Sequence, residues 1–71
     1  MVRAWLKEAR VNKGMTMQEL ASMLGISWQS ISYYENGMRR PSPETAIRVG
    51  KILGIDWRRF YDDERKEGKG A

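Results

Sequence analysis

The sequence contains no cysteine and no histidine. Without cysteine, the chain can form neither a disulfide framework nor a thiolate metal site. Without histidine, it lacks the commonest metal ligand and the usual general base at neutral pH. We therefore expect no metal site and no cofactor, and we expect the fold to be stabilised by packing alone.

Long apolar runs are also absent from the sequence. No stretch approaches the roughly 20 apolar residues that a membrane-spanning helix needs. The first residues do not resemble the apolar core of a secretory signal. We therefore expect a cytoplasmic protein without membrane association. With 71 residues, of which 41% are hydrophobic, the chain can form one small domain with a compact core.

The chain is moderately basic, with 13 Lys and Arg against 9 Asp and Glu and a net charge of +4. This excess favours a polyanionic partner, although many solvated small domains are equally basic. The sequence shows no paired carboxylates on one helix and no glycine-rich phosphate loop. A single carboxylate such as Glu35 is a weak candidate for a catalytic acid. We therefore expect a binding protein rather than an enzyme.

Apolar residues recur with the period of a helix, and no segment alternates like a strand. Val2, Leu6 and Ala9 form one apolar stripe, and further helices are expected at about 17–24 and 28–35. The spacing of Thr16 and Glu19 is that of a capping box, and Ser27, Ser42 and Asp56 are candidate N-caps for the later helices. The pattern predicts an all-α domain over residues 1–61, followed by a flexible charged tail over 62–71.

The helices expected at about 17–24 and 28–35 are separated only by Gly25-Ile26-Ser27. Two short helices joined by a three-residue turn that contains glycine form a helix-turn-helix, in which the second helix can enter the DNA major groove. Many helical bundles also contain such a pair, so this geometry alone is moderately specific.

The motifs QELA, LGIS, ENG and RPSPET follow one another at intervals that are highly specific for one family of helix-turn-helix proteins. From about Trp5 to Tyr61 the sequence resembles the Cro/repressor-type helix-turn-helix regulators of phages and bacteria, also called the xenobiotic response element family. The resemblance implies a compact five-helix, lambda-repressor-like domain that binds double-stranded DNA, commonly as a homodimer.

The helix at 28–35 is the expected recognition helix. A helical wheel places Gln29, Ser32 and Tyr33 opposite the core-facing Ile31, with Trp28 on the flank. Glutamine can bind adenine through two hydrogen bonds, and serine and tyrosine can also contact base edges. The resemblance assigns base contacts to the following four positions: Trp28, Gln29, Ser32 and Tyr33. The alternative is a solvated helix face.

Contacts with the DNA backbone are expected from two other places. The first N–H groups of the helix at 17–24, around Met17 and Gln18, favour a phosphate. The resemblance adds further positions along the backbone path: Ser30, Asn36, Met38 through its N–H, Arg39 and Arg40. The alternative for the two arginines is a pair of solvated loop charges.

Met17 and Trp28 depart from the family, which commonly carries polar residues at both positions. One hypothesis is that Met17 packs on Trp28 through a sulfur–aromatic contact and places the indole against a sugar or a thymine methyl group. The alternative is that Met17 completes the apolar stripe of its own helix and Trp28 covers it.

Two more sets of residues gain roles from the resemblance. Arg10 and Glu35 are expected to form a structural, partly buried ion pair between the first and third helices. Trp57, Phe60 and Tyr61 are expected to cap the core and to contribute to a dimer interface.

The resulting hypothesis is a sequence-specific transcriptional repressor that binds a pseudo-palindromic operator as a dimer. The alternative is an antitoxin-like module that binds a protein partner, a toxin, as well as DNA. An exposed apolar patch near Trp5 or Trp57 that survives dimerisation would favour this alternative.

Overall fold

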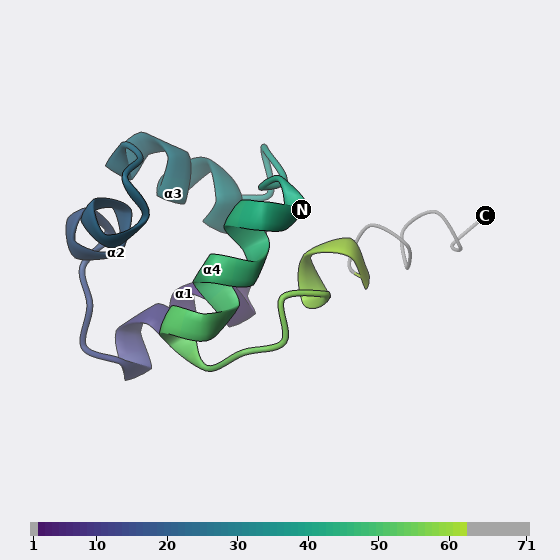
Figure 1. Ribbon diagram of the computed structural model, residues 1–71, viewed down its shortest axis with the longest axis horizontal. Helices are drawn as coiled ribbons and strands as arrows, with labels where there is room; N and C mark the ends of the chain where they lie inside the picture. Colours follow the sequence, from purple (N-terminus) through teal and green to yellow (C-terminus); the bar gives the residue numbers. More distant parts are fainter. Residues whose placement is uncertain (1, 63–71) are drawn as a thin grey trace. The chain divides into compact units, whose positions relative to one another are not determined.

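The computed structural model describes residues 2–62 and is drawn in Figure 1. It contains four α-helices: α1 (Ala4–Asn12), α2 (Met17–Leu24), α3 (Trp28–Glu35) and α4 (Pro43–Leu53). Residues 59–62 form a further helical turn, and no strand occurs within residues 2–62. The predicted all-α, five-helix fold is therefore confirmed. No helix of this part of the chain combines the length and the apolarity needed to span a membrane.

The chain divides into two compact units, Met1–Arg40 and Pro41–Ala71. The first unit contains α1, α2 and α3, and its buried apolar side chains are Leu6, Leu20, Ala21, Leu24 and Ile31. The second unit contains α4 and the helical turn at 59–62, and it buries Ala46, Val49, Leu53 and Phe60. Of the predicted tail, Asp62 lies in this helical turn, and 63–71 lie outside the described residues.

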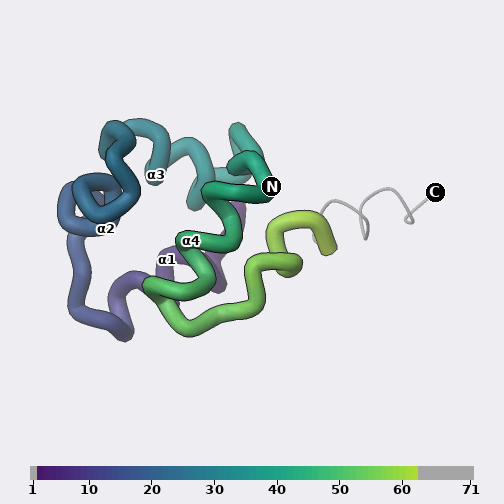
Figure 2. The backbone as a smooth tube through the Cα atoms, in the orientation of Figure 1, coloured from purple at the N-terminus to yellow at the C-terminus, as the bar shows by residue number. Residues whose placement is uncertain are grey.

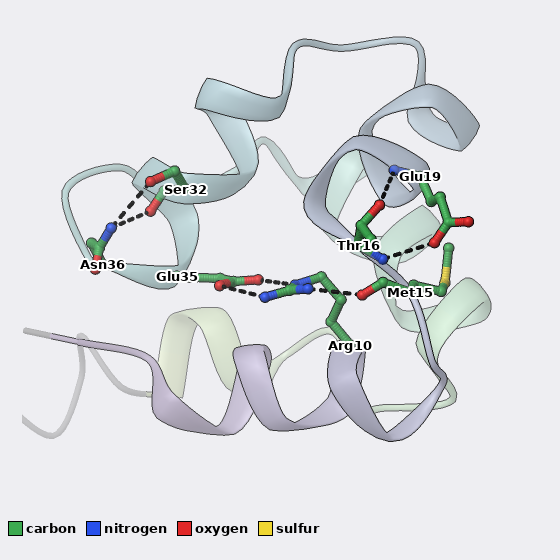
Figure 3. A network of polar contacts seen from close by, with 7 residues as sticks. All are labelled: Arg10, Met15, Thr16, Glu19, Ser32, Glu35 and Asn36. Carbon is green, nitrogen blue, oxygen red and sulfur yellow. Dashed lines mark hydrogen bonds and ion pairs between the residues drawn. The ribbon is translucent and has the colours of Figure 1, made fainter.

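The boundaries of α2 follow from its sequence. The Thr16 hydroxyl accepts a hydrogen bond from the Glu19 N–H at 3.0 Å, and the Glu19 carboxylate accepts one from the Thr16 N–H at 2.8 Å. The predicted capping box is thus confirmed, and Figure 3 shows both bonds. The helix ends at Gly25, whose φ of 71° lies in the left-handed region that glycine adopts without strain.

Helices α3 and α4 begin at the predicted caps, and Asp56 caps the turn that leads into the helical turn at 59–62. The Ser27 hydroxyl accepts a bond from the Ser30 N–H at 3.3 Å, and the Ser42 hydroxyl accepts one from the Thr45 N–H at the same distance. Beyond α4, the Asp56 carboxylate accepts a bond from the Arg58 N–H at 3.0 Å. Each cap satisfies a backbone donor that a helix or turn leaves without a partner at its start.

The start of α1 differs from the prediction. Val2 was expected on the buried stripe, but it precedes the helix and is 67% exposed. The helical spacing that would align Val2 with Leu6 does not apply, because α1 begins only at Ala4. The buried residues of the first turns are instead Arg3 and Leu6.

Candidate nucleic-acid interface

The pair α2 and α3 forms the helix-turn-helix, and Figure 2 shows the short connection between them. The N–H of Ile26 donates to the Ala21 carbonyl at 3.1 Å, and the N–H of Gly25 donates to Ser22 at 3.3 Å. These bonds satisfy carbonyls at the end of α2 and fix the path of the turn. Leu24 of α2 and Ile31 of α3 are buried, so the opposite face of α3 is available to a ligand.

The outward face of α3 carries the residues expected to contact bases. Gln29 is exposed, Trp28 is 45% exposed and Tyr33 is 37% exposed. Ser32 is half-buried, and its carbonyl accepts a bond from the Asn36 side-chain amide at 2.9 Å. The same amide lies 3.2 Å from the Ser32 hydroxyl, as Figure 3 shows. Asn36 is therefore held against the end of α3, with Ser32 less accessible than Gln29.

The basic loop at 38–40 turns back onto this face. The guanidinium carbon of Arg39 lies 5.0 Å from the centroid of the Tyr33 ring, within the range of a cation–π contact. The N–H of Met38 donates to the Tyr33 carbonyl at 2.9 Å. This N–H was expected to donate to a phosphate, but it is already bonded within the protein. The exposed Arg39 and Arg40 retain their place beside the end of α3.

The start of α2 lies in the same unit. The capping box engages the Glu19 N–H rather than the N–H groups of Met17 and Gln18. Gln18 is exposed, whereas Met17 is half-buried and lines a hollow with Val11 and Asn36. The sulfur–aromatic contact between Met17 and Trp28 stays a prediction, and so do the phosphate contacts of this helix end.

The predicted ion pair between Arg10 and Glu35 is present. Arg10 Nε lies 2.6 Å from Glu35 Oε2, and Nη2 lies 3.4 Å from Oε1. The two side chains are only 8% and 5% exposed, so the pair is more deeply buried than expected. Arg10 Nη1 also donates to the Met15 carbonyl at 2.8 Å. As Figure 3 shows, one side chain of α1 thereby joins α3 to the segment before α2.

The sequence does not predict the burial of Arg3. This residue is 3% exposed, and its Nη1 donates to the carbonyls of Tyr34 at 2.7 Å and Arg39 at 2.9 Å. Nothing in the local pattern indicates this burial, because an arginine that precedes an amphipathic helix is normally solvated. Its partners lie 31 and 36 residues further along the chain.

The three C-terminal aromatics do not share one environment. Phe60 is 0% exposed, so it belongs to the core and cannot itself present a surface to a second copy. Trp57 and Tyr61 are half-buried, and their rings meet edge to face with centroids 5.8 Å apart. The Tyr61 hydroxyl donates to the Pro41 carbonyl at 3.1 Å. Of the predicted dimer residues, only Trp57 and Tyr61 retain exposed area.

A glycine turn that presents a polar helix face beside a basic loop is the arrangement of a DNA-binding helix-turn-helix protein. The comparison with known proteins agrees. A family model described as "Helix-turn-helix" matches residues 6–60. The chain therefore belongs to the helix-turn-helix family of Cro/repressor-type transcriptional regulators. This is a family of DNA-binding regulators rather than of enzymes.

Several similar proteins are named HTH-type transcriptional regulators. The uncharacterized HTH-type transcriptional regulator YqaF of Bacillus subtilis is 39% identical over 69 residues, which cover 97% of this chain and 91% of YqaF. An uncharacterized HTH-type transcriptional regulator of Archaeoglobus fulgidus is 31% identical over 70 residues, 96% of this chain and 100% of that protein. The SPbeta prophage-derived regulator YonR of Bacillus subtilis is 38% identical over 50 residues, 70% of this chain and 46% of YonR. No solved structure gives a significant match.

Proposed function

We propose that this DNA-binding regulator is a sequence-specific repressor that inserts α3 into the major groove. The observation that supports this most directly is the outward face of α3, where Gln29 and Tyr33 are exposed and the Arg39 guanidinium lies 5.0 Å from the Tyr33 ring centroid. Hydrogen-bonding side chains next to a positive charge suit the combination of base edges and phosphates that a groove offers.

Gln29 is the residue to which we assign the main base contact, a bidentate pair with adenine. Tyr33 offers a hydroxyl and an apolar edge, Trp28 an apolar surface for a thymine methyl group, and Ser32 a hydroxyl. Backbone contacts are assigned to the start of α2 at Met17 and Gln18, and to Ser30 and Asn36. The basic loop completes the set through Arg39 and Arg40, whereas the Met38 N–H is bonded to the Tyr33 carbonyl and receives no phosphate contact.

We further propose that residues 1–61 act as one DNA-binding domain and that the protein binds its operator as a homodimer. Trp57 and Tyr61 are the assigned contact residues, since both keep exposed aromatic area. Two-fold symmetry would require a pseudo-palindromic operator with half-sites about 34–36 Å apart. Such a repressor acts without catalysis and in the cytoplasm, where the DNA that it controls is found.

The test is a selection from a random duplex DNA library with the purified chain at moderate salt. We expect enrichment of an inverted repeat with half-sites about one helical turn apart. Binding that is weak, uniform across sequences and steeply lost with salt would refute sequence-specific repression. That result would turn the search to a protein partner.

Two charge variants refine this test. Replacement of Arg40 by alanine should weaken binding to all sequences alike and lower the salt slope by about one. Lys13→Ala is the matched control, because Lys13 is also exposed and loses the same charge but has no assigned DNA contact. Equal effects of the two substitutions would contradict a specific role for the basic loop.

A further inference from the structure

The C-terminal end of α3 is completed from outside the helix. A helix leaves its last four carbonyls without a partner inside the regular ladder. In α3 the Ser32 carbonyl accepts a bond from the Asn36 N–H at 2.9 Å, and the Tyr33 carbonyl accepts one from the Met38 N–H at 2.9 Å. The Tyr34 carbonyl accepts a longer bond from the Gly37 N–H at 3.3 Å, and the Glu35 carbonyl is the last of the helix.

Arg3 donates to both of these carbonyls. Its backbone N–H donates to Glu35 at 2.7 Å, and its Nη1 donates to Tyr34 at 2.7 Å, where the Gly37 N–H also reaches at 3.3 Å. The last turn of α3 contains no basic residue of its own. Arg3 therefore supplies the positive charge that favours the negative end of a helix dipole.

The same nitrogen of Arg3 also holds the basic loop. Nη1 donates to the Arg39 carbonyl at 2.9 Å, so one guanidinium joins the end of α3 to the backbone of that loop. The Arg39 side chain in turn lies over Tyr33, 5.0 Å from the ring centroid. Because Arg3 is only 3% exposed, its influence on a ligand has to pass through the residues that it holds.

We propose that Arg3 is a positioning residue for DNA binding, which fixes the basic loop and directs the Arg39 guanidinium toward the DNA backbone. The proposal rests on the DNA-binding mode proposed above and adds to it a determinant that makes no contact with DNA. Arginine suits this role because the planar guanidinium fixes the directions of the two N–H groups of Nη1, whereas the N–H groups of a lysine amine rotate on a flexible stem.

The test is a double-mutant cycle on the operator that the library selection yields. Arg3→Met keeps an unbranched side chain but removes every side-chain donor, and Arg39→Ala removes the positioned charge. We expect each single variant to bind about tenfold more weakly and with a salt slope lower by about one. The double variant should bind no more weakly than Arg39→Ala alone, because both changes remove the same contact.

A purely structural role predicts a different result. If Arg3 only stabilises the fold, the folded fraction of Arg3→Met will bind DNA with the wild-type salt slope. The affinity that Arg3→Met loses will then add to the affinity that Arg39→Ala loses. Either finding would overturn the proposal. Circular dichroism at the assay temperature determines the folded fraction, and Lys13→Ala again provides the charge control.

Arg3→Lys is the second variant, and it decides the question if Arg3→Met does not fold. It keeps the positive charge and the backbone N–H, and we expect its salt slope to fall in the same direction. A slope equal to that of wild type would overturn the proposal. If the wild-type chain itself shows no sequence preference, it is the proposed function that fails, independently of Arg3.

Discussion

Both compact units bury apolar side chains, but among the described residues only the first unit also buries charged ones. In the part of the chain that the structure describes, the buried charged side chains are Arg3, Arg10 and Glu35, and all belong to Met1–Arg40. The unit that begins at Pro41 buries apolar side chains such as Val49 and Phe60. Apolar burial is non-directional, whereas hydrogen bonds and buried ion pairs require a defined geometry.

This difference matches the roles that we assign to the two units. The first unit carries α3 and the basic loop, whose orientation toward DNA must be accurate. Arg10 and Arg3 hold those elements through bonds of 2.6–2.9 Å to Glu35, Tyr34 and Arg39. The second unit carries no assigned base contact, so dense packing is sufficient for it.

Breaking the buried ion pair from one side should have the largest effect on stability. Glu35→Ala leaves the Arg10 charge buried without its partner, which we expect to lower the free energy of unfolding by about 3–5 kcal/mol. Denaturant unfolding followed by circular dichroism measures the loss. The double variant Arg10→Met/Glu35→Leu should recover much of it, because no uncompensated charge is left.

The exposed pair of the second unit is the control for this result. Arg58 Nε lies 3.1 Å from Asp56 Oδ1, but these side chains are 69% and 51% exposed. Arg58→Ala should therefore change the free energy of unfolding very little. If Glu35→Ala and Arg58→Ala lowered the free energy of unfolding by similar amounts, burial would not explain how much each ion pair stabilises the fold.

Close packing in the second unit should give an intermediate effect. A Cβ atom added at Gly50 would lie 2.7 Å from the Ile55 carbonyl oxygen and 3.3 Å from the Trp57 Cβ. The main chain at Ile55 is bonded back to Gly50 at 3.0 Å and cannot withdraw without breaking this bond. We expect Gly50→Ala to cost about 1–3 kcal/mol of overpacking, partly offset by about 1 kcal/mol of helix propensity.

The neighbouring Lys51→Ala provides the reference in the same unfolding experiment. Lys51 is exposed on α4, so its truncation should leave stability nearly unchanged. A Gly50→Ala protein as stable as the Lys51→Ala protein would mean that the segment after α4 is free to move away.

The smallest expected effect is a change in stability at low pH that comes from Asp56. Hydrogen bonds from the Arg58 side chain and backbone N–H hold the pKa of Asp56 below its usual value of 3.8. Folding thus favours the ionised carboxylate, which adds to the stability of the folded state. This stabilisation is present above pH 3.8 and is lost as the pH falls through the lower pKa of the folded state. An NMR titration of Asp56 should show the lowered pKa, and Arg58→Ala should raise it. An unchanged midpoint in that variant would contradict the assignment.

The features that follow from local rules could be predicted from the sequence. The capping box of Thr16 and Glu19 and the cap at Ser27 each join groups three residues apart, so short-range spacing is sufficient to find them. The all-α fold and the paired helices around Gly25 follow from helical periodicity and turn chemistry in the same way.

Long-range contacts were harder to anticipate. The Arg10–Glu35 pair spans 25 residues and came from the family resemblance rather than from spacing. The role of Arg3 depends on carbonyls that only the tertiary fold brings near, so no sequence pattern reveals it. Phe60 shows the same limit, because its aromatic character fits a core and an interface equally well until its burial is known.

Selection of the DNA sequence by the outward face of α3 is the core of the proposed function. Its most direct test compares wild type with Gln29→Ala on the selected operator and on every single-base variant of one half-site. We predict that Gln29→Ala loses about 1–3 kcal/mol of discrimination at one adenine position and keeps its other preferences. Identical base preferences in the two proteins would contradict the claim.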